Sequence, residues 1–276
     1  RDVGKYKIPD TPGVYIFRGP RKKILYIGKA TSLRSRVRSY FSKDIADTRG
    51  PLILRMLEAA IGIDWEETQS VLEALLLEAN LIKKHTPDYN SKEKDNRSFN
   101  YLVITKERFP RVLIIRGREL LSNRVAKLRG GEVKYTFGPF PQGGVLKDAV
   151  TIIRKIFPFR DRCTPCFEQL QKAELFSNSC ELENKQCKAC FNAQIGLCPG
   201  ICSGKMEAKE YGRRIQNIKL LFEGKKSLLI KNLDRDMKIY SKKKEFERAA
   251  EARNQIAALT HIKETALIGS EYRLSH

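Results

Sequence analysis

Two short β-rich segments on either side of a turn constrain the fold of this chain more than any other feature of its sequence. Residues 13–17 and 24–28 are separated by RGPRKK, in which the Gly-Pro pair is typical of a turn. The pattern predicts a β-hairpin that places Tyr15 and Tyr26 on adjacent strands, each beside a glycine. An arginine-rich helix, LRSRVRSYF, follows, so strong positive charge comes directly after the two tyrosines.

The next segments complete a compact unit. LILRMLEAA predicts a helix, IGIDWEET a third strand, and VLEALLLEANLIKKH a long helix that is capped by Ser70 and stopped by Pro87. We therefore expect an α/β (α+β) fold, with a three-stranded antiparallel sheet flanked by helices over residues 10–92.

Beyond this unit the character of the sequence changes. Two strands around Pro110, a Gly/Pro-rich aromatic loop (KYTFGPFPQGG) and an amphipathic helix predict a small β-containing region. The remaining predicted parts are an α/β connecting region at 97–160, a cysteine-rich metal-binding segment at 161–205, a linking helix at 206–230 and a helical hairpin at 231–267.

Composition indicates a polyanionic partner. Lys plus Arg is 53 against 32 Asp plus Glu, which gives a formal net charge of +21 and a sequence pI near 9.7. Such an excess favours nucleic acid over an acidic membrane, and a ribosome-like or merely soluble basic surface is the alternative. The sequence has no apolar run of about 18 residues and no signal-peptide pattern, so we expect a cytoplasmic protein without a membrane partner.

Cations near the tyrosines form a candidate phosphate site. Arg36 and Tyr40 are four residues apart and share one helix face, and Lys29 lies just before this helix. A guanidinium fork and an ammonium group together match a phosphate. Arg34 and Arg38 lie on a neighbouring face and are candidates for DNA binding, whereas the alternative for the whole group is a solvated basic face.

Glu78 occupies an unexpected position in the long helix. It falls within an apolar stripe of i, i+4, i+7, i+11 spacing formed with Val71, Leu75 and Ile82. A carboxylate there costs several kcal/mol unless a cation or hydrogen-bond donors compensate it. Hydrated Mg²⁺ beside a phosphate would do so, and the alternative is a rim glutamate paired with Lys83 or Arg36.

All seven cysteines lie between residues 163 and 202, which favours a metal over disulfides in a reducing compartment. Two Cys-x₂-Cys pairs separated by twenty residues match the spacing of a tetrahedral zinc ribbon, with the ligands Cys163, Cys166, Cys187 and Cys190. A structural role without metal is the alternative.

The C-terminal helical pair is expected to expose an apolar seam unless something covers it. Leu233, Met237 and Tyr240 lie on its first helix. A second, similar hairpin from a partner would cover the seam, and packing on the rest of this chain is the alternative. The candidate partner-binding residues are on the second helix: Phe246, Ala249, Ala250, Arg253 and Ile256.

Taken in order, PGVY, LYIGKA, LRSRVRSYF and EALLLEANLIKKHTPDYN closely resemble the GIY-YIG nuclease domain of the UvrC family of bacterial excinuclease subunits. The resemblance continues through YTFGPFP, IRKIFPFR, IGLCPGIC and EFERAAEARNQI, and so covers nearly the whole chain. It implies an endonuclease in which both tyrosine hydroxyls of the hairpin meet one phosphate and the arginines hold it.

The resemblance also implies which residues act. The counterpart of Glu78 holds one divalent metal ion, Mg²⁺ or Mn²⁺, and Tyr26 is the best candidate to accept the proton of the attacking water. Arg36 would neutralise charge that grows on the phosphoryl oxygens. The other implied site residues position or orient groups, or are glycines that permit close backbone approach: Gly13, Tyr15, Gly28, Lys29, Tyr40 and Asn90.

For CFNAQIGLCPGIC the resemblance implies a [4Fe–4S] cluster, or alternatively Zn²⁺, with the ligands Cys163, Cys190, Cys198 and Cys202. A separate zinc knuckle, or spare thiols, would then account for the three cysteines of an insertion that departs from the family pattern: Cys166, Cys180 and Cys187.

The function that the resemblance implies is incision of damaged double-stranded DNA on the 3′ side of a lesion, in the complex of UvrB with DNA, during nucleotide excision repair and the SOS response. UvrB would bind through the UVR motif, which the C-terminal hairpin resembles, and UvrA would act indirectly. The alternatives are a stand-alone GIY-YIG endonuclease that chooses its own sites, and a non-catalytic DNA-binding scaffold organised by its metal cluster. Family members carry a second nuclease after this region, so the chain is either a fragment or a naturally short homologue.

Overall fold

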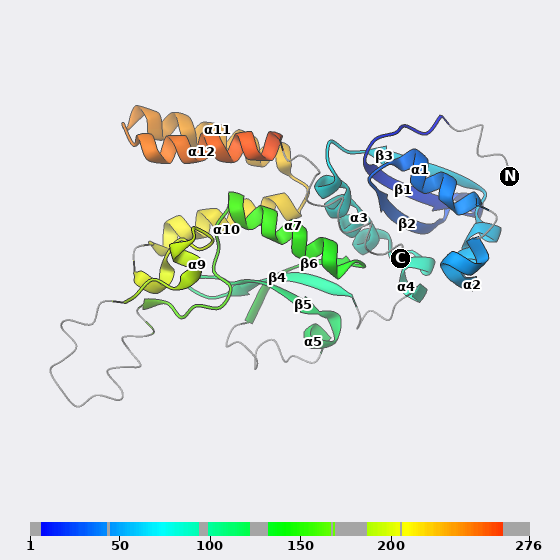
Figure 1. The fold of residues 1–276 in the computed structure, drawn as a ribbon, viewed down its shortest axis with the longest axis horizontal. Coiled ribbons are helices and arrows are strands. Elements are labelled where there is room, and N and C mark those ends of the chain that lie inside the picture. Colours follow the sequence, from blue (N-terminus) through cyan, green and yellow to red (C-terminus); the bar gives the residue numbers. More distant parts are fainter. Residues whose placement is uncertain are drawn as a thin grey trace.

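The computed structural model describes residues 7–42, 45–93, 99–121, 132–166, 168, 187–204 and 206–261. These residues form two three-stranded antiparallel sheets, surrounding helices and a helical hairpin (Figure 1). The arrangement confirms the predicted α+β fold class. No helix within these ranges has both the length and the apolar character needed to span a bilayer.

The N-terminal unit (residues 7–93) is built on the predicted hairpin. Its sheet has the order β2-β1-β3 and consists of β1 (Gly13–Arg18), β2 (Ile24–Ala30) and β3 (Gly62–Glu67). In the β1–β2 register Tyr15 lies opposite Gly28, and Phe17 lies opposite Tyr26. The two tyrosines are therefore diagonal neighbours, with ring centroids 6.3 Å apart.

Helices surround this sheet (Figure 1). They and the short 3-10 segments are η2 (Pro20–Lys22), α1 (Leu33–Arg38), η3 (Ser39–Phe41), α2 (Ile45–Ala59), α3 (Val71–His85) and α4 (Asp88–Glu93). Ser32 begins α1 and Ser70 begins α3, because each serine oxygen accepts a hydrogen bond of 3.2 Å from a backbone N–H three residues later. The two serines thus fix where both helices start, and the cap at Ser70 is the one that the sequence predicted.

Helix α3 belongs to two hydrophobic cores at once. Ala74 and Ile82 pack with β1 and β2 residues of the N-terminal unit. Leu72, Leu75 and Leu76 instead pack into the large cluster formed by the rest of the chain. A helix held on two sides in this way cannot shift without disturbing both cores, so it gives its side chains a fixed position.

The middle region (residues 99–166) contains the second sheet, in the order β5-β4-β6. Helix α7 follows the sheet. The elements of the middle region are β4 (Asn100–Lys106), β5 (Val112–Arg116), α5 (Gly117–Leu121), β6 (Glu132–Phe140) and α7 (Gly143–Ile156). The prediction of a loop from residue 134 was wrong, because residues 132–140 form a strand that pairs with β4. Pro139 is accommodated because β6 is an edge strand and its register is irregular at this end.

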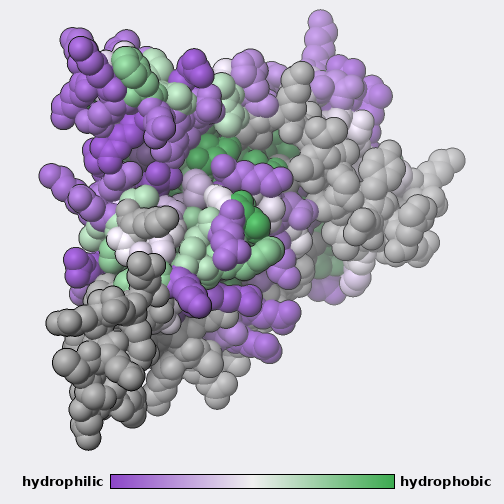
Figure 2. Space-filling model, turned by 60° about the vertical axis from the view of Figure 1, so that its left-hand side comes forward, coloured by the Kyte–Doolittle hydropathy of each residue, from purple (hydrophilic) through white to green (hydrophobic). Residues whose placement is uncertain are grey.

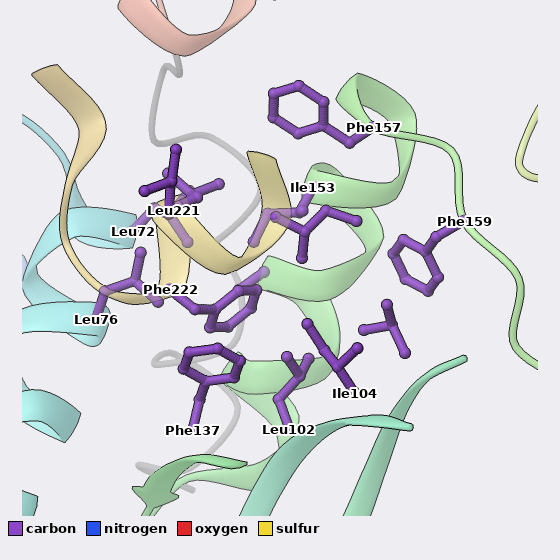
Figure 3. Packing of buried hydrophobic residues seen from close by; sticks show 14 of the residues in the cluster. Leu72, Leu76, Leu102, Ile104, Phe137, Ile153, Phe157, Phe159, Leu221 and Phe222 are labelled. Atoms are coloured by element: carbon purple, nitrogen blue, oxygen red, sulfur yellow. The ribbon is translucent and has the colours of Figure 1, made fainter. Parts of the chain in front are cut away.

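The large cluster joins α3, the second sheet, α7 and α10 around a set of aromatic rings. Figure 3 shows side chains from these elements pointing toward one another, among them Phe137 of β6 and Phe222 of α10. The centroids of these two rings lie 5.4 Å apart. Each fully buried large apolar side chain contributes about 1.5–3 kcal/mol, so this cluster is the main source of stability shared by the different parts.

The C-terminal part is helical (Figure 1). Its elements are α9 (Phe191–Gln194), η5 (Ile201–Ser203), α10 (Ala208–Phe222), α11 (Lys226–Lys242) and α12 (Phe246–Thr260). The hairpin α11–α12 therefore starts at Lys226, earlier than the predicted boundary at 231, and residues 262–267 of the predicted hairpin lie outside the described residues. Helix α12 is connected to α10 by two ion pairs of 2.8 Å, Arg214–Glu251 and Arg248–Glu210.

The cysteine-rich segment is attached to the middle sheet through Arg160. This side chain is 3% exposed, forms an ion pair of 2.9 Å with Glu107, and donates to the carbonyl oxygen of Cys163 at 2.6 Å. The hydroxyl of Tyr211 accepts from the Arg160 backbone N–H and donates to the carbonyl of Pro110. The buried charge is thus paired and hydrogen-bonded, as burial requires.

The close packing of the β1–β2 hairpin yields a stability prediction. In Gly28→Ala the added carbon would lie 2.3 Å from the hydroxyl oxygen of Tyr15, so the free energy of unfolding should fall by about 1–3 kcal/mol. Gly62→Ala on β3 is the matched control, because no heavy atom lies within 4 Å of its added carbon, and it should change stability by less than about 1 kcal/mol. Urea unfolding followed by circular dichroism measures both, and equal losses would contradict the packing described here.

Candidate active site

The predicted site residues surround one cavity of about 360 Å³, which we call the tyrosine cavity. All seven predicted catalytic residues line it: Tyr15, Tyr26, Lys29, Arg36, Tyr40, Glu78 and Asn90. They come from β1, β2, α1, η3, α3 and α4. The fold therefore brings together residues that are spread over more than seventy positions of the sequence.

Three tyrosines and an arginine form one wall of the cavity. The hydroxyls of Tyr15 and Tyr40 are hydrogen-bonded at 2.7 Å, and Arg36 Nε donates to the Tyr15 hydroxyl at 3.4 Å. Burial, reinforced by Tyr40, raises the pKa of Tyr15 well above its ordinary value. Tyr15 is consequently a neutral phenol that can position other groups, while Tyr26 is only half-buried.

Gly28 makes room for the ring of Tyr15. A Cβ at this position would lie 2.3 Å from the Tyr15 hydroxyl oxygen, so any larger residue would displace the ring. Gly13 has a different tight neighbour, since its Cβ would lie 2.3 Å from the backbone oxygen of Glu66 on β3. One glycine shapes the cavity, and the other allows β1 and β3 to approach.

Glu78 is 7% exposed and lies where α3 crosses β2. Its Oε1 accepts a hydrogen bond of 2.9 Å from the backbone N–H of Lys29, whose own side chain is 4% exposed. Lys83, one of the two candidate partners in the alternative of a rim glutamate, donates to the carbonyl of Thr136 at 3.2 Å. A buried carboxylate that lines a polar cavity provides the hard oxygen ligand that Mg²⁺ or Mn²⁺ prefers, so the residues present fit such an ion.

Asn90 supports the backbone of β2. Its Oδ1 accepts from the Ile27 N–H and its Nδ2 donates to the Ile27 carbonyl, both at 2.8 Å. Because β2 is an edge strand, the amide replaces the missing neighbouring strand at this residue. Asn90 thereby orients the strand between Tyr26 and Gly28.

Four further residues line the tyrosine cavity that the sequence analysis did not identify: Ile53, Phe99, Pro141 and Gln142. The last three come from the middle region, so the cavity lies between the N-terminal unit and this region. The aromatic Gly/Pro-rich segment FGPFPQGG, which contains Pro141 and Gln142, was the signal that could have pointed to these two. Arg34 and Arg38, in contrast, are exposed and do not line the cavity.

The structure divides the described cysteines into two groups. The sulfurs of Cys163, Cys190 and Cys202 lie within 4.8 Å of one another. Cys198 joins them through a hydrogen bond from Cys163, which lowers the pKa of Cys198 to about 6. These four are the set that the family resemblance implies.

The other two described cysteines correct the expectation that the cysteines bind metal and form no disulfides. Cys166 and Cys187 form a disulfide, with Cα atoms 5.6 Å apart. They are therefore not available as ligands of the zinc ribbon that the two Cys-x₂-Cys pairs suggested. Spacing alone could not separate these sets, because it does not show which thiols meet in space. Cys180 lies outside the described residues.

The predicted partner-binding residues lie on α12 with different exposure. Phe246 is 67% exposed and Arg253 is exposed, whereas Ala249 and Ala250 are half-buried. Ile256 packs against the chain's own large cluster. The surface that includes the hairpin is mostly hydrophilic, with small hydrophobic patches (Figure 2).

Three protein-family models match consecutive parts of the chain. They are the UvrC-like GIY-YIG domain at residues 11–91, the UvrC/Cho excinuclease middle domain at 99–221 and the UvrB/UvrC motif at 227–261. Together they leave only short connecting and terminal stretches unmatched. The order of the three matches is the order that the sequence motifs indicated.

Curated relatives agree with these matches. UvrABC system protein C of Desulforudis audaxviator is 37% identical over 92% of this chain and 36% of its own length. The protein of the same name from Carboxydothermus hydrogenoformans is 38% identical over 92% of this chain and 37% of its own length. The chain thus spans little more than a third of the curated relatives it matches.

A solved structure matches the first part of the chain. It is the GIY-YIG N-terminal endonuclease domain of UvrC from Thermotoga maritima bound to magnesium, 39% identical, covering 30% of this chain and 88% of that domain with a TM-score of 0.27. From the three consecutive family matches and the identity to curated relatives, we conclude that the chain belongs to the UvrC family.

Proposed function

We propose that this protein is a metal-dependent endonuclease of nucleotide excision repair that cuts damaged DNA on the 3′ side of a lesion in the complex of UvrB with DNA. The observation that carries the proposal is the tyrosine cavity, in which a buried carboxylate, a guanidinium group and three phenols surround one space. The size of the cavity, about 360 Å³, suits a phosphate group with water.

In the proposed reaction a water attacks phosphorus, a new O–P bond forms, and the bond from phosphorus to the leaving sugar oxygen breaks. Glu78 would hold the divalent ion, which supplies polarisation of the phosphoryl oxygen when bound. Arg36 balances the negative charge that develops on the phosphoryl oxygens. Lys29 adds a second positive charge inside the cavity.

Tyr26 is the proposed acceptor of the water's proton, in its phenolate form, which nearby cations such as Lys29 would favour. Tyr15 is unsuited to this role, because its hydroxyl is hydrogen-bonded to Tyr40 and its pKa is raised by burial. Tyr26 lies in the same cavity, is less buried, and is next to Ile27, whose backbone Asn90 holds in place. Tyr15, Tyr40 and Asn90 are accordingly positioning residues in this scheme.

The proposed partners follow from charge and exposure. The net charge of +21 supports binding to double-stranded DNA, as do the exposed Arg34 and Arg38 on the helix that carries Arg36. The proposed place of action is accordingly the cytoplasm. Ile239, in the last turn of α11, is 42% exposed, and Phe246, the first residue of α12, is 67% exposed. The turn of the hairpin therefore presents apolar surface. This surface supports docking of UvrB there, with UvrA acting through UvrB.

The cysteine group supports a bound metal. Cys163, Cys190, Cys198 and Cys202 provide four sulfur ligands, for which we propose a [4Fe–4S] cluster with Zn²⁺ as the second candidate. The Arg160 contact ties this site to the middle sheet. Its proposed role is structural, because none of these cysteines lines the tyrosine cavity.

Loss of the Glu78 carboxylate tests the nuclease. Glu78→Gln should reduce 3′ incision of lesion-containing duplex by about 1,000-fold in the presence of UvrA, UvrB and Mg²⁺, which corresponds to about 4 kcal/mol of transition-state stabilisation. Glu66→Gln, an exposed carboxylate on β3, is the matched control and should cut normally. Undiminished incision by Glu78→Gln would favour a non-catalytic scaffold, and lesion-independent cutting without UvrB would favour a stand-alone endonuclease.

Anaerobically purified protein tests the cluster. A [4Fe–4S] centre should give a broad visible absorption band together with iron and acid-labile sulfide. Cys198→Ser and Cys202→Ser should each lose the band, while the double variant Cys166→Ser with Cys187→Ser should keep it. A colourless protein with one zinc per chain would instead assign the site to Zn²⁺.

Truncation of Phe246 tests the docking of UvrB. Phe246→Ala should weaken binding to UvrB by about 30-fold, in line with about 2 kcal/mol for a central aromatic contact. Ile61→Ala in the N-terminal unit is the matched control, since Ile61 is 63% exposed and far from the hairpin in sequence. Titration calorimetry with purified UvrB provides the comparison, and equal affinity of both variants would place the interface elsewhere.

A further inference from the structure

Gln142 has a property that no other described side chain shares. Its Oε1 is the one buried side-chain oxygen or nitrogen atom without a hydrogen-bond partner in the part of the chain that the structure describes. The residue belongs to the middle region, yet it lines the tyrosine cavity. An unsatisfied buried acceptor is costly and rare in native proteins, so its position within a polar cavity calls for an explanation.

The position of Gln142 is fixed by its neighbours. It is the residue before α7, with extended backbone angles of φ −109° and ψ 97°, and its side chain makes no capping bond to that helix. Gly143 packs so closely on Asn100 that a Cβ there would lie 2.4 Å from Asn100 Nδ2. Gln142 therefore belongs to a segment that is closely packed against β4.

Gln142 and Glu78 are held by the same hydrophobic cluster. Val145 and Leu146 of the first turns of α7 are 1% and 0% exposed and belong to the large cluster. Leu75 and Ala79, which flank Glu78 on α3, belong to it too. The middle region and α3 thus form one rigid support for two oxygen-bearing side chains that line one cavity.

The chemistry of an amide oxygen decides what it can bind here. An unpartnered carbonyl oxygen accepts a hydrogen bond, so it cannot bind a phosphate oxygen, which is also an acceptor. A divalent ion held by one carboxylate keeps several waters, and each of these waters is a strong donor. The tyrosine cavity, at about 360 Å³, has room for such a hydrated ion.

We propose that the middle region completes the nuclease site, with Gln142 as a positioning residue whose Oε1 accepts a hydrogen bond from a water in the hydration shell of the ion held by Glu78. The inference rests on the proposed nuclease function. It assigns to the segment FGPFPQGG an indirect part in holding the metal ion, through a water. This segment lies outside residues 11–91, which the GIY-YIG model matches.

The test uses the 276-residue chain and Mn²⁺ without DNA. Gln142→Ala and Gln142→Leu should weaken Mn²⁺ binding about 10-fold, measured by electron paramagnetic resonance of free Mn²⁺, as expected for loss of an outer contact to a metal site. Gln142→Glu keeps an acceptor and should bind Mn²⁺ at least as tightly as the wild type. Gln216→Ala, an exposed glutamine on α10, is the matched control and should bind normally.

Thermal unfolding separates this role from a structural one. Without metal, Gln142→Leu should melt at the wild-type temperature or higher, because the substitution removes an unsatisfied buried acceptor. The increase in melting temperature on adding Mn²⁺ should become smaller. A lower melting temperature of metal-free Gln142→Leu with unchanged Mn²⁺ affinity would show that Gln142 supports only the fold and would overturn the proposal.

Glu78→Gln distinguishes failure of this inference from failure of the proposed function. If Glu78→Gln binds Mn²⁺ as tightly as the wild type, the metal site itself is wrong and the proposed function fails with it. If Glu78→Gln abolishes Mn²⁺ binding while the Gln142 variants bind normally, only the role of Gln142 is wrong. A raised KM for DNA with unchanged Mn²⁺ affinity would assign Gln142 to the DNA and would equally overturn the proposal.

Discussion

The burial of α3 between two hydrophobic cores is the constraint on which the rest of this structure depends. One side of the helix packs on the sheet that carries the tyrosines, and Leu72, Leu75 and Leu76 pack into the cluster shared with the middle region. Glu78 lies on this helix and is bonded to the backbone of Lys29 on β2. The carboxylate is therefore fixed relative to the phenols by packing, and its own hydrogen bond adds only the final orientation.

Much of this arrangement could be predicted from the sequence. The Gly-Pro turn and the two β-rich segments indicated the hairpin, and the i, i+4, i+7, i+11 spacing indicated that Glu78 is buried, as its 7% exposure shows. Both signals are local, because a turn and a helix face are determined by residues close in sequence. The gathering of seven candidate residues around one cavity agrees with their assignment, and their catalytic roles stay predictions.

The parts that could not be predicted depend on contacts between distant residues. The glycines and prolines of residues 134–144 suggested a loop, but residues 132–140 form a strand because they pair with β4 at an edge position. Phe99, Pro141 and Gln142 reach the cavity through packing of the middle region on α3, which joins residues far apart in the sequence. Likewise, the spacing of the cysteines could not show that Cys166 meets Cys187 while the other four described thiols gather.

The shared packing of α3 has a consequence for how such proteins can diverge. The family matches divide the chain between residues 91 and 99, whereas the hydrophobic cluster extends across that boundary to Phe137 and Phe222. A substitution on the second face of α3 would require compensation in β6 or α10, so these segments should covary among homologues. Recombination that joined the N-terminal unit of one lineage to the middle region of another would place mismatched surfaces against each other, and selection should keep the two parts inherited together.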